Sequence, residues 1–372
     1  MSEPIVLDDG FTVPTRYWHR LADGRVQCDV CPRACKLHEG QRGVCFVRGR
    51  SPDPASDGIV LTTYGRSSGY CIDPIEKKPL NHFYPGTPVL SFGTAGCNLV
   101  CRFCQNWDIS KSKQIHSLGS AATPRAIAEA AVELGCTSVA FTYNDPVIFL
   151  EYANDTAIAC RERGIKTVGV TAGYVCPEPR VEMFRHIDAV NVDLKAFDED
   201  FYRHLTGSSL AVTLETISYL CNHTDVWVEL TNLVIPGHND SDDEISAMCD
   251  WVVDEVGPDV PIHFSAFHPD FRMLDTPPTP PETLARARSI ALESGIHHAY
   301  TGNVHDADGD TTWCPACGAA VIVRDWYQIR SHQITDDGRC GACGHVIHGR
   351  FDGPPGNWGR RRQPVSIEGR GS

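Results

Sequence analysis

Residues 97–107, with the sequence CNLVCRFCQNW, place three cysteines within eight residues. Structural zinc sites take four ligands, often as two Cys-x-x-Cys pairs, so three cysteines leave one ligand position to be filled. A cubane [4Fe–4S] cluster has four irons that each need an outside ligand, and three thiolates leave one iron open. The C-x3-C-x2-C spacing of Cys97, Cys101 and Cys104 suits three corners of a cubane better than one tetrahedral ion. We therefore expect an iron–sulfur cluster here, with zinc and a distant fourth ligand as the alternative.

Strand and helix signals alternate on both sides of this loop. Continuous apolar runs predict strands at 88–95, 137–143, 165–173, 188–195, 226–235, 261–267 and 297–302. The segments between them predict helices at 123–135, 145–164, 177–187, 211–222, 240–256 and 281–295. The first of these helices has Thr123 as its N-cap and Pro124 at its first position. Buried strands separated by helices of ten or more residues indicate a parallel sheet with helical crossovers.

The number of units predicts an α/β fold built as a partial (βα)6 barrel. About six βα units and a closing strand are fewer than the eight of a complete TIM barrel. An incomplete barrel leaves a side open, which suits a large or macromolecular substrate. Chemistry in such folds gathers at the carboxyl ends of the strands, and the cysteine loop follows the first strand. The predicted organisation is a Cys-rich region (1–85), the barrel (86–305), a zinc ribbon (306–352) and a mobile tail (353–372).

The composition indicates the cellular compartment and limits the classes of binding partner. The 372 residues carry a formal net charge of −14, which argues against general binding to nucleic acid. No apolar run of about 18 residues is present, so we expect no membrane-spanning helix. The N-terminus lacks a basic segment followed by an apolar stretch, so we expect no secretion signal. Seventeen cysteines then indicate a reducing compartment and metal ligands rather than disulfides, and we expect a cytoplasmic protein.

Two further groups of cysteines have the spacing of metal ligands. Near the C-terminus, CPAC and CGAC are separated by 22 residues, and this pattern predicts a four-cysteine zinc ribbon formed by Cys314, Cys317, Cys340 and Cys343. Near the N-terminus, four cysteines within 18 residues have the spacing C-x2-C-x3-C-x9-C, which fits either zinc or an auxiliary iron–sulfur cluster: Cys28, Cys31, Cys35 and Cys45. The sequence does not choose between these metals. The six remaining cysteines are isolated, and we expect small buried hydrophobic side chains there.

Several segments together carry a resemblance to a known family. The loop CNLVCRFCQNW after a strand, with TYNDP, VNVDLKAF, LVIPGHNDS and CPRAC elsewhere, resembles the radical S-adenosylmethionine (SAM) superfamily. Within it, the chain resembles the radical SAM member of the AmmeMemoRadiSam system, which is related to the pyruvate formate-lyase activating enzymes. The resemblance covers roughly residues 25–350. It implies that the open iron binds SAM, that the reduced cluster splits SAM into methionine and a 5′-deoxyadenosyl radical, and that this radical takes hydrogen from a substrate.

The same resemblance assigns SAM contacts near the cluster. Phe103, between the last two cysteines, occupies the position of an aromatic residue near the adenine, and packing beside the cluster is its plainer role. Asn144 and Asp145 follow the second strand, where the superfamily binds the SAM amino group. Related chains usually have Glu where Asp145 stands, and a helix N-cap before Pro146 is the alternative role of this carboxylate.

Further contacts are implied at later strand ends. Thr171 and Gly173 close the third strand. Asp193 and Lys195 close the fourth, where we expect Lys195 to contact the SAM carboxylate or ribose, with an ion pair to Asp193 as the structural alternative. His268, after the sixth strand, resembles a cofactor-contacting histidine of the activases, and a histidine held only by structural hydrogen bonds is the alternative.

The resemblance also implies partners. The name of the system indicates a Memo-like protein and an AMMECR-type protein, and cluster reduction needs an electron donor such as a flavodoxin or ferredoxin. The substrate is not predicted. Two other functions compete with this one: an activase that makes a glycyl radical on another enzyme, and a non-catalytic iron–sulfur and zinc scaffold that binds a partner.

Overall fold

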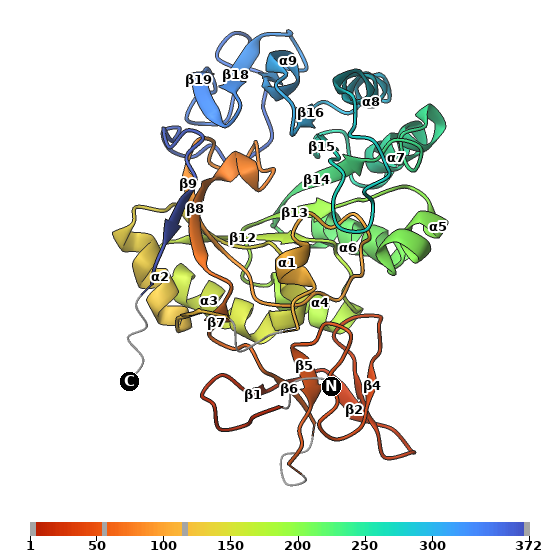
Figure 1. Ribbon diagram of the computed structural model, residues 1–372. Coiled ribbons are helices and arrows are strands. Elements are labelled where there is room, and N and C mark those ends of the chain that lie inside the picture. Colours follow the sequence, from red (N-terminus) through yellow and green to blue (C-terminus); the bar gives the residue numbers. More distant parts are fainter. Residues whose placement is uncertain (1–4, 54–57, 114–117, 368–372) are drawn as a thin grey trace. The chain divides into compact units, whose positions relative to one another are not determined.

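The computed structural model describes residues 5–53, 58–113 and 118–367 (Figure 1). The chain divides into two compact units, each built from separate stretches of sequence. The first unit contains residues 1–72, 90–187 and 363–372, and the second contains residues 73–89 and 188–362. None of the helices among the described residues has the length and apolar character needed to cross a membrane.

The first unit carries the opening βα repeats. Its strands lie in the order β12, β11, β9, β8, β20, and their bounds are Lys166–Thr171, Ser138–Phe141, Pro88–Phe92, Tyr70–Pro74 and Gln363–Val365. Strands β11 and β12 pair in parallel, with Ser138 opposite Lys166. The helices between and after them are α2 (Pro124–Glu133), α3 (Leu150–Arg161) and α4 (Pro177–Phe184). Helix α2 begins as expected, because the Thr123 side chain accepts a hydrogen bond from the N–H of Ala126.

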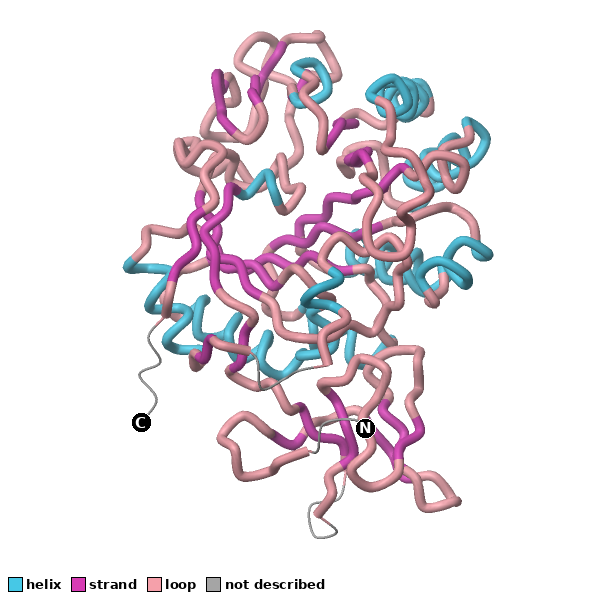
Figure 2. The backbone as a smooth tube through the Cα atoms, viewed as in Figure 1, coloured by secondary structure: helices cyan, strands magenta, loops and turns pink. Residues whose placement is uncertain are grey.

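The N-terminal part of this unit consists of short strands joined by long loops (Figure 2). Two three-stranded sheets have the orders β1-β6-β5 and β2-β3-β4, and a two-stranded ribbon joins β7 to β10. Their bounds are Val13–Pro14, Trp18–Arg20, Val26–Cys28, Lys36–Leu37, Arg48–Arg50, Ile59–Leu61, Arg66–Ser67 and, for β10, Ser120–Ala121. Such small sheets bury little apolar surface, so this region depends on other sources of stability.

The C-terminal tail differs from the expectation of a mobile segment over 353–372. Within it, Gln363–Val365 forms β20, which pairs antiparallel with β8, and Gln363 lies opposite Ile72. Strand β20 is the last strand of its sheet, and Pro364 is tolerated there because an edge strand can lack one backbone donor. A three-residue strand whose partner is far away in the sequence leaves no periodic signal. The last residues of the predicted tail, 368–372, lie outside the described residues.

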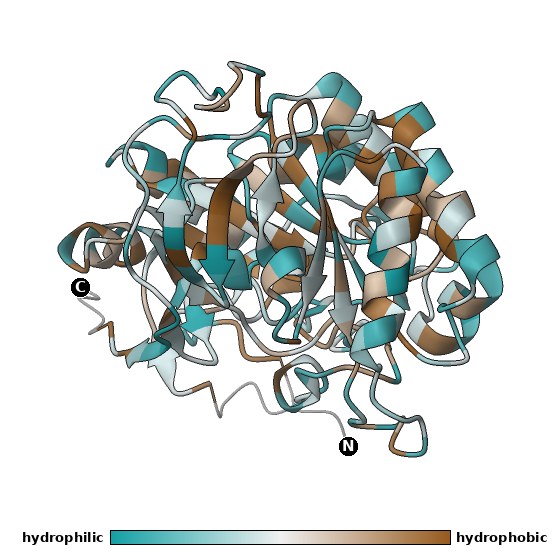
Figure 3. Cartoon of the chain, turned by 90° about the horizontal axis from the view of Figure 1, so that it is seen from above, coloured by the Kyte–Doolittle hydropathy of each residue, from teal (hydrophilic) through white to brown (hydrophobic). Residues whose placement is uncertain are grey.

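The second unit continues the parallel pattern. Strands β13 (Ala189–Asp193), β14 (Trp227–Val234), β15 (Ile262–Ala266) and β16 (Ala299–Gly302) pair in parallel in chain order. Helices α6 (Leu210–His223), α7 (Asp242–Glu255) and α8 (Pro281–Glu293) connect them. Helices of the chain show hydrophilic and hydrophobic residues side by side (Figure 3), as expected for elements that cover a sheet. The parallel strands and their crossovers confirm the predicted α/β class.

Short elements that the sequence pattern missed lie at the edges of this unit. They are the turns η1 (Ile75–Lys77), α5 (Glu199–Phe201) and η4 (Tyr202–Thr206), the last of which is π-helical. After β16 come α9 (Ala307–Asp310) and a three-stranded antiparallel sheet formed by β17 (Thr312–Trp313), β18 (Ala320–Asp325) and β19 (Gln328–His332). This sheet carries the predicted zinc ribbon.

A buried histidine cluster joins the ribbon to the strands of the second unit. The His82 ring contacts the carbonyl of His348 at 2.7 Å and the hydroxyl of Tyr300 at 2.6 Å. The ring of His298 lies 4.4 Å from that of His82. Burial lowers the pKa of His82 well below its ordinary value and lowers the pKa of His298 to about 4, so both rings are neutral at pH 7.

Candidate functional site

The three-cysteine loop follows β9 and leads into α1 (Trp107–Ser110). Cys101 is buried, whereas Cys97 and Cys104 are half-buried. The hydroxyl of Ser110 lies 3.0 Å from Cys104 Sγ. Beyond α1, Lys111 donates from Nζ to the carbonyl of Leu99 at 2.8 Å, which ties the loop closed. The loop is therefore a folded structure at the carboxyl end of a strand, where parallel α/β folds place their chemistry.

Asn144 clamps the start of this loop. Its Nδ2 donates to the carbonyls of Gly96 at 2.8 Å and Ala95 at 3.4 Å, and its Oδ1 accepts from the N–H of Thr94 at 3.3 Å. The neighbouring strand ends approach closely, because a Cβ on Gly93 would lie 2.2 Å from the carbonyl oxygen of Thr142. Asn144 thus positions the cysteine loop through three hydrogen bonds, in addition to the cofactor role that the resemblance implies.

Asp145 joins the ends of β11 and β12. Its Oδ1 accepts from the N–H of Val147 at 3.1 Å and from the hydroxyl of Thr171 at 2.9 Å, while Oδ2 accepts from the N–H of Ala172 at 3.0 Å. The first contact is the predicted N-cap role, here for the turn η3 (Pro146–Phe149). The N–H of Gly173 in turn contacts the Thr171 hydroxyl at 3.1 Å. The structure therefore brings together four of the predicted strand-end residues, Asn144, Asp145, Thr171 and Gly173.

The charge environment of Cys97 fits a bound cation. Burial and the negative charge of Asp145 raise the pKa of Cys97 to about 12, although the charge of Lys111 opposes them. A metal ligand must be a thiolate, so this buried thiol gives up its proton only when positive charge arrives. Phe103 is buried between Cys101 and Cys104. Three thiols in one loop, with the Asp145 carboxylate close to Cys97, fit a cluster that leaves one iron for a cationic ligand.

The remaining predicted SAM contacts belong to the second unit. Lys195 Nζ lies 2.8 Å from Asp193 Oδ2, so the ion pair considered from the sequence is formed. The backbone around Lys195 is held firmly, because its N–H donates to the Tyr202 hydroxyl at 3.0 Å and its carbonyl accepts from Asn239 Nδ2 at 2.7 Å. His268 follows β15 and is exposed.

The four C-terminal cysteines converge on one point. Cys314 Sγ lies 3.6 Å from Cys343 Sγ, and Cys317 Sγ lies 3.8 Å from Cys340 Sγ. Zinc–sulfur bonds of about 2.3 Å that point to the corners of a tetrahedron hold sulfurs about 3.8 Å apart. Burial raises the pKa of Cys340, but hydrogen bonds from the N–H groups of Ala342 and Cys343 outweigh it, and the pKa is lowered to about 7. The spacing and this activated thiol fit a zinc ion.

The two Cys-x-x-Cys turns of this ribbon have the same backbone form. In each, a glycine just after the second cysteine has a positive φ, 70° at Gly318 and 77° at Gly344. Their N–H groups donate to the carbonyls of Cys314 at 2.9 Å and Cys340 at 2.8 Å. The glycines therefore close both turns in a conformation that other residues rarely adopt.

The four N-terminal cysteines line a pocket in the first unit, together with the nearby Arg48 and with Ile148, which is distant in sequence. Arg48 is buried, donates from Nε to the carbonyl of Ile148 at 2.8 Å, and forms an ion pair with Glu151. Sequence reasoning missed Arg48, and also missed Ser110 and Lys111 beside the cysteine loop. Lysine is rare in this chain, so Lys111, seven residues after Cys104, offered a signal, whereas Arg48 offered none.

Comparison with known proteins supports the same chemistry. The model of the radical SAM superfamily matches residues 92–249. An uncharacterized protein of Methanocaldococcus jannaschii, MJ0808, is 39% identical over 332 residues, which cover 89% of this chain and 97% of that protein.

Two activating enzymes are more distant relatives. The pyruvate formate-lyase 1-activating enzyme of Escherichia coli K12 is 26% identical over 230 residues, which cover 57% of this chain and 91% of the enzyme. The 4-hydroxyphenylacetate decarboxylase activating enzyme of Clostridioides difficile is 27% identical over 158 residues, covering 40% of this chain and 49% of the enzyme. With the cysteine loop and its clamp, these matches identify the chain as an enzyme of the radical SAM superfamily, related to the pyruvate formate-lyase activating enzymes.

Proposed function

We propose that this enzyme cleaves SAM reductively at a [4Fe–4S] cluster held by Cys97, Cys101 and Cys104, and that it does so within the AmmeMemoRadiSam system on a substrate still to be found. The observation that carries the proposal is the clamped three-thiol loop beside the Asp145 carboxylate. When bound and reduced, the cluster supplies the electron that splits SAM into methionine and a 5′-deoxyadenosyl radical.

The residues around the loop support this chemistry by binding and orientation. SAM carries an ammonium and a sulfonium, so the negative charge of Asp145 favours its binding beside Cys97. Thr171 orients that carboxylate through a hydrogen bond of 2.9 Å. Phe103, between the last two cysteines of the loop, is buried. Asp193, Lys195, Gly173 and His268 complete the proposed SAM contacts on the strength of the resemblance.

A second candidate is a glycyl-radical activase. It is favoured by the two relatives that are named as activating enzymes. The same SAM cleavage serves both candidates, and they differ in the molecule that loses hydrogen. A Memo-like and an AMMECR-type protein are the proposed partners of the first, a glycyl-radical enzyme is the partner of the second, and both need a low-potential electron donor.

The direct test is the formation of 5′-deoxyadenosine in an anaerobic reaction with SAM and dithionite, measured by mass spectrometry. The wild-type chain should form it, and Cys101→Ala should abolish both the product and the cluster at this loop. Cys136→Ala, at a buried isolated cysteine, is the matched control and should retain both. A fully loaded and reduced cluster that forms no product, even with both proposed partners present, would favour the non-catalytic scaffold.

Lys195→Ala tests the proposed SAM contacts separately from the binding of the cluster. Losing a charged contact should weaken SAM binding by roughly 10- to 100-fold, because a hydrogen bond to a charged group is worth about 1.5–3 kcal/mol. The iron content should not change. Unaltered SAM affinity, measured by calorimetry on the loaded protein, would leave Lys195 with only its ion pair to Asp193.

A further inference from the structure

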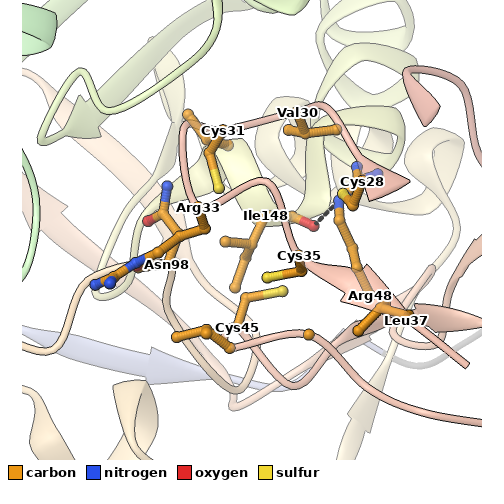
Figure 4. A pocket seen from close by; sticks show the side chains of 13 residues that line it. Cys28, Val30, Cys31, Arg33, Cys35, Leu37, Cys45, Arg48, Asn98 and Ile148 are labelled. Atoms are coloured by element: carbon orange, nitrogen blue, oxygen red, sulfur yellow. Dashed lines mark hydrogen bonds between the residues drawn. The ribbon is translucent and has the colours of Figure 1, made fainter. Parts of the chain in front are cut away.

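We infer that Cys28, Cys31, Cys35 and Cys45 bind a second [4Fe–4S] cluster, which passes single electrons to the cluster at the three-cysteine loop. The electron-transfer part of this inference rests on the proposed function, whereas the metal assignment does not. The pocket is drawn in Figure 4, in which the four thiols face a common space and Arg33 and Arg48 lie on either side of it.

The spacing of the sulfurs separates this site from a zinc site. The four C-terminal cysteines have ligand atoms that all lie within 4.8 Å of one another. Among the residues that the structure describes, no other group of three or more His, Cys, Asp or Glu side chains converges to this extent. The N-terminal thiols lie near one another, since Cys35 and Cys45 both affect the pKa of Cys28, but they do not converge in that way. A cubane keeps its thiolates roughly 6 Å apart, because each binds a different iron. The N-terminal set is therefore arranged for a cluster.

Unpaired hydrogen-bond donors in the pocket support the same ligand. Arg48 Nη1 and Arg33 Nη2 are buried and have no hydrogen-bond partner, and both residues line the pocket. A buried donor without a partner costs about 1–3 kcal/mol, so a native structure normally supplies an acceptor. The sulfides and thiolates of a cluster accept such hydrogen bonds, which also adjust its potential. A cluster therefore supplies acceptors for the two N–H groups, Arg48 Nη1 and Arg33 Nη2, that lack them.

The pocket adjoins the three-cysteine loop. Asn98, the residue after Cys97, is one of its lining residues, and Arg33 donates from Nε to the carbonyl of Asn98 at 2.8 Å. The backbones also touch, because a Cβ on Gly96 would lie 2.0 Å from the carbonyl oxygen of Cys45. Cys45, of the N-terminal set, is thus part of this contact, and Cys97, of the three-cysteine loop, is the next residue after Gly96. An electron can cross directly from one site to the other.

The ligand count decides the role of each cluster. Four thiolates leave no iron open, so the second cluster cannot bind SAM and exchanges electrons only. A low-potential one-electron donor protein, of the flavodoxin or ferredoxin class, reduces it by one electron. That electron then moves to the cluster held by three thiolates, and the second cluster returns to its oxidised state. No bond or proton changes at the second site.

The test compares metal content in three proteins purified anaerobically with iron and zinc both supplied. The wild type should hold about eight irons, eight sulfides and one zinc per chain. The double variant Cys35→Ala/Cys45→Ala should lose about half of the iron and sulfide. The triple variant Cys97→Ala/Cys101→Ala/Cys104→Ala leaves the N-terminal site untouched and should also retain about four irons. Cys136→Ala serves as the control for cysteine replacement.

Electron paramagnetic resonance supplies a readout that does not depend on catalysis. In the reduced wild type the two clusters should broaden each other by spin coupling, and each variant should show one sharp signal. Iron absent from the triple variant, with two zincs in the wild type, would overturn the cluster assignment. Two uncoupled signals would overturn the electron transfer. A triple variant with four irons beside a wild type that never cleaves SAM would sink the proposed function and leave this site standing.

Discussion

The two four-cysteine sites of this protein have the same ligands but different surroundings. The C-terminal cysteines belong to one small antiparallel sheet, and their sulfurs meet within 4.8 Å. The N-terminal cysteines share their pocket with Arg48, Asn98 and Ile148, and among the described residues no three of their sulfurs lie within 4.8 Å of one another. The comparison teaches that the spacing of four cysteines along a chain does not select a metal. In our proposal the distance between the sulfurs after folding selects the metal, together with the charges and donors around them.

The largest expected effect is at the C-terminal site. Cys317→Ser should remove about one zinc per chain and unfold the ribbon, because zinc binding supplies on the order of 10 kcal/mol to such modules. The measurement is zinc content together with hydrogen exchange across 312–347, where exchange should become fast. Cys221→Ser, at a half-buried isolated cysteine, is the control. If zinc content stayed the same, the ribbon would not be the zinc site.

A cobalt experiment can break the comparison directly. Cobalt(II) bound by four converging thiolates gives intense visible absorption, and the metal-free wild type should gain this absorption for one ion per chain. Cys317→Ser should abolish it, and the N-terminal double variant should retain it. Absorption from two tetrahedral cobalt ions in the wild type would mean that both sites select a single ion. The two sites would then not differ in the kind of metal group that they bind.

The next effect is at Arg48, which ties the N-terminal pocket to the core. Its side chain is 3% exposed and forms an ion pair with Glu151, whose side chain is 10% exposed. Removing one partner of a buried pair typically costs about 3–5 kcal/mol, so Arg48→Met should lower the free energy of unfolding of the first unit by that order in urea. Arg48→Met/Glu151→Leu should recover much of the loss.

The matched control is Arg125→Met, which removes an ion pair on the surface of α2. Arg125 is 78% exposed and pairs with Glu129. Such pairs contribute less than about 1 kcal/mol, so this variant should be close to the wild type. Equal effects from Arg48→Met and Arg125→Met would show that the N-terminal site is not built into the core, contrary to the comparison.

The smallest effect is a pH dependence that the ribbon side should show. The folded pKa of His298 is about 4, below its ordinary value of 6.5. The folded state therefore binds fewer protons than the unfolded state between these values, and stability falls as the pH drops through this window. Between pH 7 and pH 5 the loss should approach about 2 kcal/mol for this one group. Urea unfolding at both pH values measures it.

A variant isolates this histidine from other groups that titrate. His298→Phe keeps a ring beside His82 and cannot be protonated, so the pH-dependent difference between variant and wild type should flatten. If stability changed with pH in the same way in His298→Phe and in the wild type, the neutral His298 would not be the cause of the pH dependence.

The sequence predicted those parts of the protein whose signals are local. The cysteine loop, the two Cys-x-x-Cys turns with Gly318 and Gly344, and the alternation of strands and helices all depend on spacings of a few residues. The prediction of a mobile tail was wrong for Gln363–Val365, because β20 forms its hydrogen bonds with β8, which is far away in the chain. The choice of metal at the N-terminal cysteines was open for the same reason. Asn98 and Ile148, which the inference uses, reach the pocket only in the folded chain.

The hydrogen bond from Arg48 to Ile148 joins residues 100 positions apart, and this separation has a consequence for synthesis on the ribosome. The C-terminal ligands span only 30 residues and can capture zinc as soon as they emerge. The four N-terminal thiols emerge first, yet the wall formed by Val147 and Ile148 reaches them only after about 150 residues have left the ribosome. During that interval they are free thiols, open to oxidation and to the wrong metal. The pocket around these four thiols is therefore complete only after the first half of the chain has been translated.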